Sequence, residues 1–238
     1  MAVVALMAGT ACGEEIAERQ LTHAGAVFRI VELEPERLGL VWRDAKGEPF
    51  KWFSEVWKAK EKEGKRLRFL MNAGIYEPGP VPSGLHVEDG RELRPLNLRS
   101  GKGNFFLKPN GVFVVTKDGK AEVLESTRYP AFGKPVRLAV QSGPLLLADG
   151  VRHPKFRQGS PNLKHRNGVG INGKGQVVFA MTDKRQEVNF WDFAGLFLKL
   201  GCEDALFLDG DISQMWVNPK ESTGSNVFGA IFVVEDEP

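Results

Sequence analysis

The chain has 238 residues, of which 42% are hydrophobic and 26% are charged, as in an ordinary globular protein. Its formal net charge of +2 is too small to indicate a nucleic-acid partner. Only two cysteines are present, Cys12 and Cys202, so a framework of several disulfides is excluded. Cys202 lies between an apolar helical pattern and a strand pattern, which predicts a buried structural thiol.

The first eleven residues are small and apolar and precede Cys12, as at the end of a secretory or lipoprotein leader. No basic residue comes before this run, and Gly9 stands where a lipobox prefers Leu, so the leader is incomplete. The run is too short to span a bilayer as a helix. We therefore predict an exported protein in which residues 1–20 are a leader remnant and residues 21–238 form one domain. Membrane attachment is expected only through a lipid on Cys12, and the oligomeric state is left open.

Short strands dominate the predicted elements in chain order. Strands are expected at residues 26–33, 38–42 and 66–72, and a helix at 54–63. Ser54 is the expected N-cap of this helix and Gly64 its C-terminal stop. Tight turns predict three hairpins that pair residues 104–108 with 112–116, 112–116 with 121–124, and 168–172 with 176–182.

One strongly amphipathic helix follows Asn189, because five apolar residues from Phe190 to Leu198 fall on one helical face. Asn189 can cap its first turn, where Asp192 also opposes the positive end of the helix dipole. Strands are expected next at residues 205–208 and 227–234. The predicted fold class is α+β, with two to three helices packed on mostly antiparallel, twisted sheets.

Five polar clusters stand at the ends of apolar runs, where functional sites are often built. They are Asn72-Ala73-Gly74-Ile75-Tyr76, Gln141-Ser142-Gly143-Pro144, Lys164-His165-Arg166-Asn167-Gly168, Thr182-Asp183, and Asp209-Gly210-Asp211 with Ser213 and Gln214. We expect them to converge on one cleft. The alternative is that all five are simple turns, which is the commonest meaning of Asp-Gly.

Several familiar kinds of site are disfavoured. Ser142 lacks the G-x-S-x-G context of a hydrolase nucleophile, and Gly143-Pro144 cannot begin the helix which that motif requires. The four histidines show no metal-ligand spacing. Asp209 and Asp211 could together bind a hard cation, but two carboxylates around a glycine are weak evidence for one.

Taken in order, five motifs resemble those of the phosphodiester glycosidase family, which includes N-acetylglucosamine-1-phosphodiester α-N-acetylglucosaminidase and many bacterial exported proteins. The motifs are Asn72–Tyr76, Gln141–Leu146, Arg166–Gly170, Val188–Ala194 and Leu200–Gly210. The resemblance covers roughly residues 69–232. One departure is Asp211, where the family often has a second Gly, and Gln214 follows Ser213. The resemblance therefore supports the predicted fold, whereas it does not identify the substrate.

The resemblance implies cleavage at C1 of a sugar-1-phosphodiester, in which a phosphomonoester is the leaving group. Asp209 is the expected carboxylate at the sugar, Arg166 the expected bidentate phosphate ligand, and Asn72 completes the catalytic set. The other candidate substrate-binding residues are Gly74, Tyr76, Gln141, Ser142, Gly143, His165, Thr182, Asp183, Asn189, Asp192, Gly210, Asp211, Ser213 and Gln214. Asn189 and Asp192 are explained equally well as helix caps, and Tyr76 as a core residue.

Three functional hypotheses stay open from the sequence. The first is an exported hydrolase acting on a sugar-phosphodiester of an envelope or extracellular glycan, with no cofactor required. The second is a glycan-binding module that kept the cleft without the chemistry, which the departure at Asp211 suggests. The third is a phosphodiesterase with a divalent cation held by Asp209 and Asp211.

Overall fold

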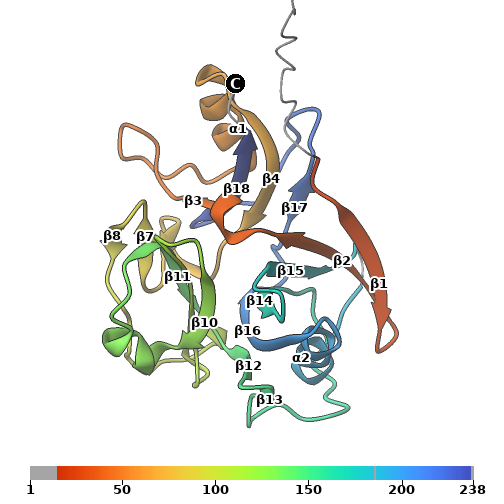
Figure 1. The fold of residues 1–238 in the computed structure, drawn as a ribbon. Helices are drawn as coiled ribbons and strands as arrows, with labels where there is room; N and C mark the ends of the chain where they lie inside the picture. The colour runs from red at the N-terminus through yellow and green to blue at the C-terminus, as the bar shows by residue number, and fades with distance from the viewer. Residues whose placement is uncertain (1–14, 185, 237–238) are drawn as a thin grey trace, which may run out of the picture.

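The computed structural model describes residues 15–184 and 186–236, so the predicted leader and Cys12 lie outside the described residues. Its strands form four sheets in which every pairing between strands is antiparallel. Two α-helices and three short 3-10 helices accompany the sheets, the latter at Pro35–Arg37, Asn104–Phe106 and Ser126–Ala131. The predicted α+β class is confirmed (Figure 1).

The largest sheet has seven strands. In spatial order they are β1 (Glu18–His23), β2 (Ala26–Leu33), β15 (Val177–Thr182), β14 (Asn167–Asn172), β16 (Cys202–Asp209), β12 (Leu145–Ala148) and β13 (Val151–Arg152). Helix α2 (Phe190–Lys199) covers one face of this sheet, where the ring of Phe193 stacks on that of Phe28. Burial raises the pKa of the Cys202 thiol under this helix to about 12, which confirms the predicted buried thiol.

Two further sheets pack against the other face. A five-stranded sheet has the order β10 (Ala121–Glu125), β9 (Gly111–Thr116), β11 (Val136–Ser142), β7 (His86–Glu88) and β8 (Arg91–Arg94). A four-stranded sheet has the order β17 (Met215–Val217), β4 (Arg66–Asn72), β18 (Ile231–Asp236) and β3 (Gly39–Val41). Strands β5 (Tyr76–Glu77) and β6 (Val81–Pro82) form a small separate ribbon.

One hydrophobic core joins the three large sheets. Phe179 of β15 lies 5.1 Å, centroid to centroid, from both Phe69 of β4 and Phe232 of β18. Phe232 also meets Phe113 of β9 edge to face at 5.6 Å. All four rings are fully buried. The sheets therefore meet through aromatic contacts, and the strand ends are held in fixed relative positions.

Three predicted details differ from the structure. Residues 104–108 are not a strand, because β9 already pairs with β10 on one edge and with β11 on the other. Helix α1 (Phe53–Lys62) begins one residue before the predicted Ser54 cap, and the hydroxyl of Ser225 accepts the Phe53 backbone N–H at 3.0 Å. Residues 18–20, predicted as part of the leader, belong to β1.

Candidate active site

Polar side chains from all three large sheets meet where their strands end. Asn72 is the last residue of β4, Ser142 the last of β11, and Asp209 the last of β16, while Asn167 opens β14. Asn167 pairs directly with Asp209 in the seven-stranded sheet. Residues of four predicted clusters therefore lie close together, and their proximity depends on the docking of separate sheets.

Asn72 and Asn167 form a buried bridge between two sheets. Asn167 Nδ2 donates to Asn72 Oδ1 at 2.9 Å, and Asn167 Oδ1 accepts the backbone N–H of Asp209 at 2.6 Å. Asn72 Oδ1 also accepts the backbone N–H of Gln214 at 3.1 Å. The bridge thus holds the segment from Asp209 to Gln214 at both ends. Asn72 Nδ2 is buried without a hydrogen-bond partner among the described residues, so it remains an available donor.

Asp209 is a carboxylate in a desolvated position. Burial raises its pKa to about 6, and the nearby Asp211 charge adds to the increase, while the hydrogen bond from the Gly210 backbone N–H opposes it. Tyr76 lies near this carboxylate, since burial and then the Asp209 charge raise the pKa of its phenol. The Tyr76 hydroxyl donates to the Val227 carbonyl at 2.8 Å. A carboxylate with a pKa near neutrality is suited to proton transfer or to charge stabilisation.

A cleft of about 760 Å³ lies beside these strand ends. Five predicted site residues line it, namely His165, Asp183, Asp211, Ser213 and Gln214. The remaining lining includes Arg29, Met181, Lys184, Glu187, Met215, Trp216 and Asn226. Asp209 is not part of the lining, but it immediately precedes the wall formed by residues 211–216. One wall of the cleft is thus formed by residues that closely follow Asp209 in the sequence, and the cleft volume suits a small-molecule substrate.

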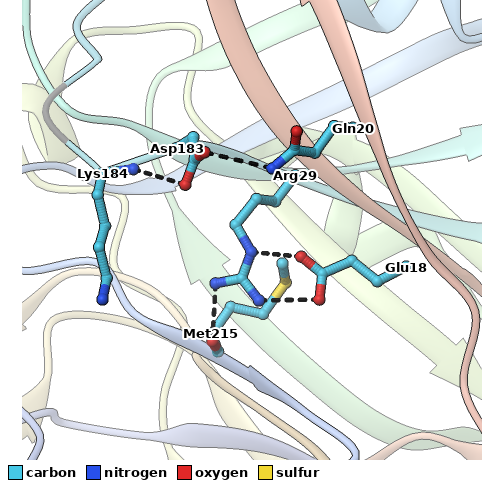
Figure 2. A network of polar contacts seen from close by, with 6 residues as sticks. All are labelled: Glu18, Gln20, Arg29, Asp183, Lys184 and Met215. Atoms are coloured by element: carbon cyan, nitrogen blue, oxygen red, sulfur yellow. Dashed lines mark hydrogen bonds and ion pairs between the residues drawn. The ribbon is translucent and has the colours of Figure 1, made fainter.

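Arg29 of the N-terminal hairpin lines the cleft, and Figure 2 shows the polar contacts around it. Arg29 of β2 forms a two-pronged ion pair with Glu18 of β1, and its Nη1 donates to the Met215 carbonyl at 3.1 Å. Asp183 accepts from Gln20 Nε2 at 3.4 Å and from the Lys184 backbone N–H at 2.7 Å. Arg29 thereby ties the hairpin to the wall that follows Asp209.

Arg166 differs from its predicted role as the phosphate ligand. Its side chain is 1% exposed, and Nε and Nη2 donate to the carbonyls of Val188 (2.6 Å) and Asn162 (3.1 Å). The guanidinium also lies 3.7 Å from the ring centroid of Phe190. Burial lowers its pKa to about 10, so it stays charged at neutral pH. These contacts give Arg166 a structural position behind the cleft, because its donors face inward.

His165 and Thr182 form a polar pair at the cleft, in which His165 belongs to the lining and Thr182 does not. His165 Nδ1 lies 2.6 Å from the hydroxyl of Thr182, which is fully buried at the end of β15. The Thr182 hydroxyl also accepts the Arg166 backbone N–H at 3.0 Å. His165 reaches the cleft, whereas Thr182 positions it from behind.

The Gln141 cluster lies inside the protein, in contrast to its predicted substrate contact. Gln141 Oε1 accepts the backbone N–H groups of Leu85 and Asn97, and Nε2 donates to the Asn97 carbonyl and to Ser126 Oγ. Ser142 Oγ donates to the Leu208 carbonyl at 3.0 Å and so steadies the strand that carries Asp209. These residues shape the site through the backbone.

Close packing of neighbouring atoms explains why glycine occupies positions 74 and 143 of the predicted clusters. A Cβ on Gly143 would lie 2.7 Å from Asn110 Cβ and 2.9 Å from the Phe105 carbonyl oxygen. Gly74 has a φ of 111°, and its Cβ would lie 3.2 Å from Val140. Glycine is therefore required by packing and by backbone conformation, without reference to a ligand.

Asn189 and Asp192 cap helix α2. Asn189 Oδ1 accepts the Asp192 backbone N–H at 2.9 Å, and Asn189 Nδ2 donates to the Asp192 carboxylate at 2.8 Å and to the Ser160 carbonyl at 3.2 Å. The capping alternative is thus the one whose geometry is present. Neither residue lines the cleft beside Asp209.

The segment after Asp209 folds as a tight turn and a wall. Ser213 Oγ donates to the Gly210 carbonyl at 2.6 Å, and Gln214 Oε1 accepts the Asn226 backbone N–H at 2.6 Å. Asp211 is exposed and lies 3.3 Å from Lys164 Nζ. Asp209 and Asp211 therefore sit in different environments, one desolvated and one in solvent.

Sequence reasoning missed Asn167, Arg29 and Trp216 as parts of the site. Asn167 was within a recognised motif, but its bridge to Asn72 depends on how two sheets dock. Arg29 lies in an ordinary alternating strand, and no local signal distinguishes it from a surface arginine. Among the described residues, no group of three or more His, Cys, Asp and Glu could hold a metal ion. No helix in residues 15–184 or 186–236 is long and apolar enough to cross a membrane.

Residues 65–234 match the phosphodiester glycosidase family, and this chain therefore belongs to that family. The protein YigE of Escherichia coli K12 is 40% identical over 190 residues, which are 79% of this chain and 72% of YigE. The predicted family resemblance is confirmed.

Solved structures show the same fold. The catalytic domain of zebrafish N-acetylglucosamine-1-phosphodiester α-N-acetylglucosaminidase, auto-inhibited by its pro-peptide, has a TM-score of 0.66 at 15% identity. That comparison covers 93% of this chain and 82% of the zebrafish domain. A putative exported protein from Burkholderia pseudomallei has a TM-score of 0.56 at 12% identity, over 88% of this chain and 74% of that protein.

Proposed function

We propose that the protein is an exported hydrolase that cleaves a sugar-1-phosphodiester of an envelope or extracellular glycan. Membership of the phosphodiester glycosidase family supports the reaction class. The observation that carries the proposal is Asp209, a desolvated carboxylate with a pKa of about 6 at the meeting point of three sheets. Export rests on the apolar N-terminal sequence before Cys12, as does attachment through a lipid there.

In this proposal the sugar binds at the end of the site formed by Asp209, Tyr76 and Asn72. Above pH 6 Asp209 is ionised, and its charge stabilises the positive charge that develops at C1 or removes a proton from the attacking water. Asn72 supports this end of the site through its hydrogen bonds with Asn167 and the Gln214 backbone. The phosphomonoester leaves toward the cleft lined by His165 and Lys184.

The experiment is hydrolysis of synthetic sugar-1-phosphodiesters by the full chain, beginning with an N-acetylglucosamine-1-phosphodiester. Asp209→Asn should lower kcat by at least about a hundredfold, as expected for loss of a catalytic carboxylate. Asp211→Asn is the matched control, because its carboxylate is exposed and paired with Lys164. Equal activity in wild type and Asp209→Asn would refute the assignment of Asp209.

The glycan-binding alternative predicts a different result with the same material. Calorimetry with envelope polysaccharide fragments would then show binding without turnover. The cation-dependent alternative predicts that chelators abolish turnover. Unchanged rates in the presence of a chelator would count against it.

A further inference from the structure

The Thr182 hydroxyl fixes which nitrogen of His165 carries the proton. Thr182 Oγ1 already accepts the Arg166 backbone N–H at 3.0 Å, so its own single proton must go elsewhere. Two acceptors are close, namely His165 Nδ1 at 2.6 Å and the Arg166 carbonyl at 3.4 Å. That carbonyl already accepts the Thr182 backbone N–H at 2.9 Å. The contact to His165 Nδ1 is much the shorter of the two, and when the hydroxyl donates along it, neutral His165 carries its proton on Nε2.

The position of His165 relative to the carboxylate follows from the sheet. Asn167 pairs with Asp209, so His165, two residues before Asn167, lies beside the turn that follows Asp209. A Cβ placed on Gly210 would lie 3.5 Å from the His165 carbonyl oxygen, which shows how closely the two segments approach. His165 lines the cleft, whereas its Nδ1 faces the buried Thr182. The protonated Nε2 is thus left for a ligand beside Asp209.

Three other cationic side chains in or beside the cleft already have protein partners. Arg166 donates to two backbone carbonyls, Arg29 is paired with Glu18, and Lys164 is paired with Asp211. Lys184 also lines the cleft, but it is exposed, and a lysine ammonium on its four-carbon chain has no fixed direction. An oriented neutral donor is therefore the feature that the site offers to a phosphate oxygen.

We propose that His165, held in one tautomer by Thr182, donates a hydrogen bond from Nε2 to the phosphate of the leaving group; this rests on the proposed function. As the C1–O bond breaks, its electron pair goes to the phosphate, and a phosphodiester monoanion becomes a phosphomonoester dianion. Water adds to C1, and its proton passes to Asp209 and then to solvent. A donor aimed at this oxygen is worth more in the transition state than in the ground state. Loss of the donor should lower kcat more than it raises KM.

Variants of His165 distinguish the effect of a hydrogen-bond donor at the Nε2 position from the effect of side-chain size. The Gln side chain can place an N–H near the Nε2 position, whereas Asn places one nearer Nδ1. We expect His165→Asn to lower kcat by about a hundredfold and His165→Gln by about tenfold, with KM changed less than threefold. Thr182→Ser keeps the hydroxyl and should stay near wild type, while Thr182→Val should resemble His165→Asn. Thermal unfolding of each variant shows that it is folded.

A second measurement does not need turnover. The ¹⁵N spectrum of the imidazole in the full-length protein reports the tautomer, and methyl phosphate serves as a probe of the phosphate position. Protonation at Nε2, with an Nε2 shift on addition of methyl phosphate, supports the proposal. Protonation at Nδ1, no shift at saturating methyl phosphate, or equal kcat in the Gln and Asn variants would overturn it. If no sugar-1-phosphodiester is hydrolysed by wild type, the proposed function fails, and the spectrum still decides the role of His165.

Discussion

At the scale of single residues, the buried Asp209 carboxylate that we propose for catalysis also lowers the stability of the folded protein. Its folded pKa of about 6 lies above the value near 3.9 of an unfolded aspartate. The folded state therefore binds the proton more tightly than the unfolded state. Below pH 4 the carboxyl is neutral in both states and the cost is absent. As the pH rises from 4 to 6 stability falls, and above pH 6 the full cost remains.

Asp209→Asn should therefore stabilise the protein while it removes activity. At about 1.4 kcal/mol for each pKa unit, we expect a gain of about 3 kcal/mol in unfolding free energy at pH 7 and little change at pH 4. Urea unfolding at both pH values measures it. Asp211→Asn, whose carboxylate is exposed, should give a much smaller gain, because burial is the main cause of the raised pKa of Asp209 and the Asp211 charge only adds to it. A gain that is equal at pH 4 and pH 7 would contradict the assigned pKa.

The same group should set the acid limb of catalysis. If ionised Asp209 is required, kcat/KM should fall about tenfold for each pH unit below 6. The profile is measured with a sugar-1-phosphodiester, whose phosphate keeps one charge across this range. A limb centred below pH 4.5 would mean that another carboxylate is responsible.

Gln141 shows that a polar residue in a family motif can be entirely structural. Gln141→Leu removes four hydrogen bonds and leaves buried backbone donors of Leu85 and Asn97 unpaired. We expect a loss of roughly 2–4 kcal/mol of stability, with kcat per folded molecule unchanged. Chemical denaturation and activity, measured on the same preparation, test both parts. A large loss of kcat in folded protein would instead support the predicted contact between Gln141 and the substrate.

At the scale of elements, helix α2 illustrates a cap that also resembles a site. Asn189→Ala should cost about 1 kcal/mol, because the N-cap hydrogen bond to Asp192 is lost. Asn189→Ser retains a capping oxygen and should recover most of that loss. Activity should change by less than twofold in both variants, because Asn189 does not line the cleft. Thermal unfolding and steady-state rates are the measurements.

The elements with strong local patterns were predictable from sequence. Strands β2 and β4 have the predicted bounds, and helix α2 begins after the predicted Asn189 cap. Local pattern failed where distant residues decide the structure. The cap of α1 comes from Ser225, 172 residues away, and residues 104–108 are excluded from a sheet whose edges are already paired.

The candidate site was predictable only in part, for the same reason. Apolar strands ending in Asn72 and Asp209 were visible locally, so these two residues could be selected. The direction of the Arg166 guanidinium depends on the carbonyls of Val188 and Asn162 and on the ring of Phe190. The wall that contains Arg29 depends on pairing between β2 and β15. Neither arrangement leaves a signature in the local sequence.

At the scale of the whole molecule, the shared aromatic core predicts one cooperative unit. Phe179 contacts two rings of the four-stranded sheet, so Phe179→Ala should cost roughly 3–5 kcal/mol. Unfolding by urea should still show one transition, with loss of activity, tryptophan fluorescence and far-UV circular dichroism coinciding. Two separated transitions would show that the sheets form independent folding units.

The Asn72–Asn167 bridge has a consequence for how the proposed activity would be gained on folding. The two amides are 95 residues apart in sequence, and Asn72 and Gln214 are 142 apart. A nascent chain or a partly folded intermediate cannot hold Asp209 in place, because the bridge forms only after the sheets have docked. Competence for hydrolysis is thereby tied to completion of the fold, and recovery of turnover after dilution from denaturant would report the last long-range step of folding.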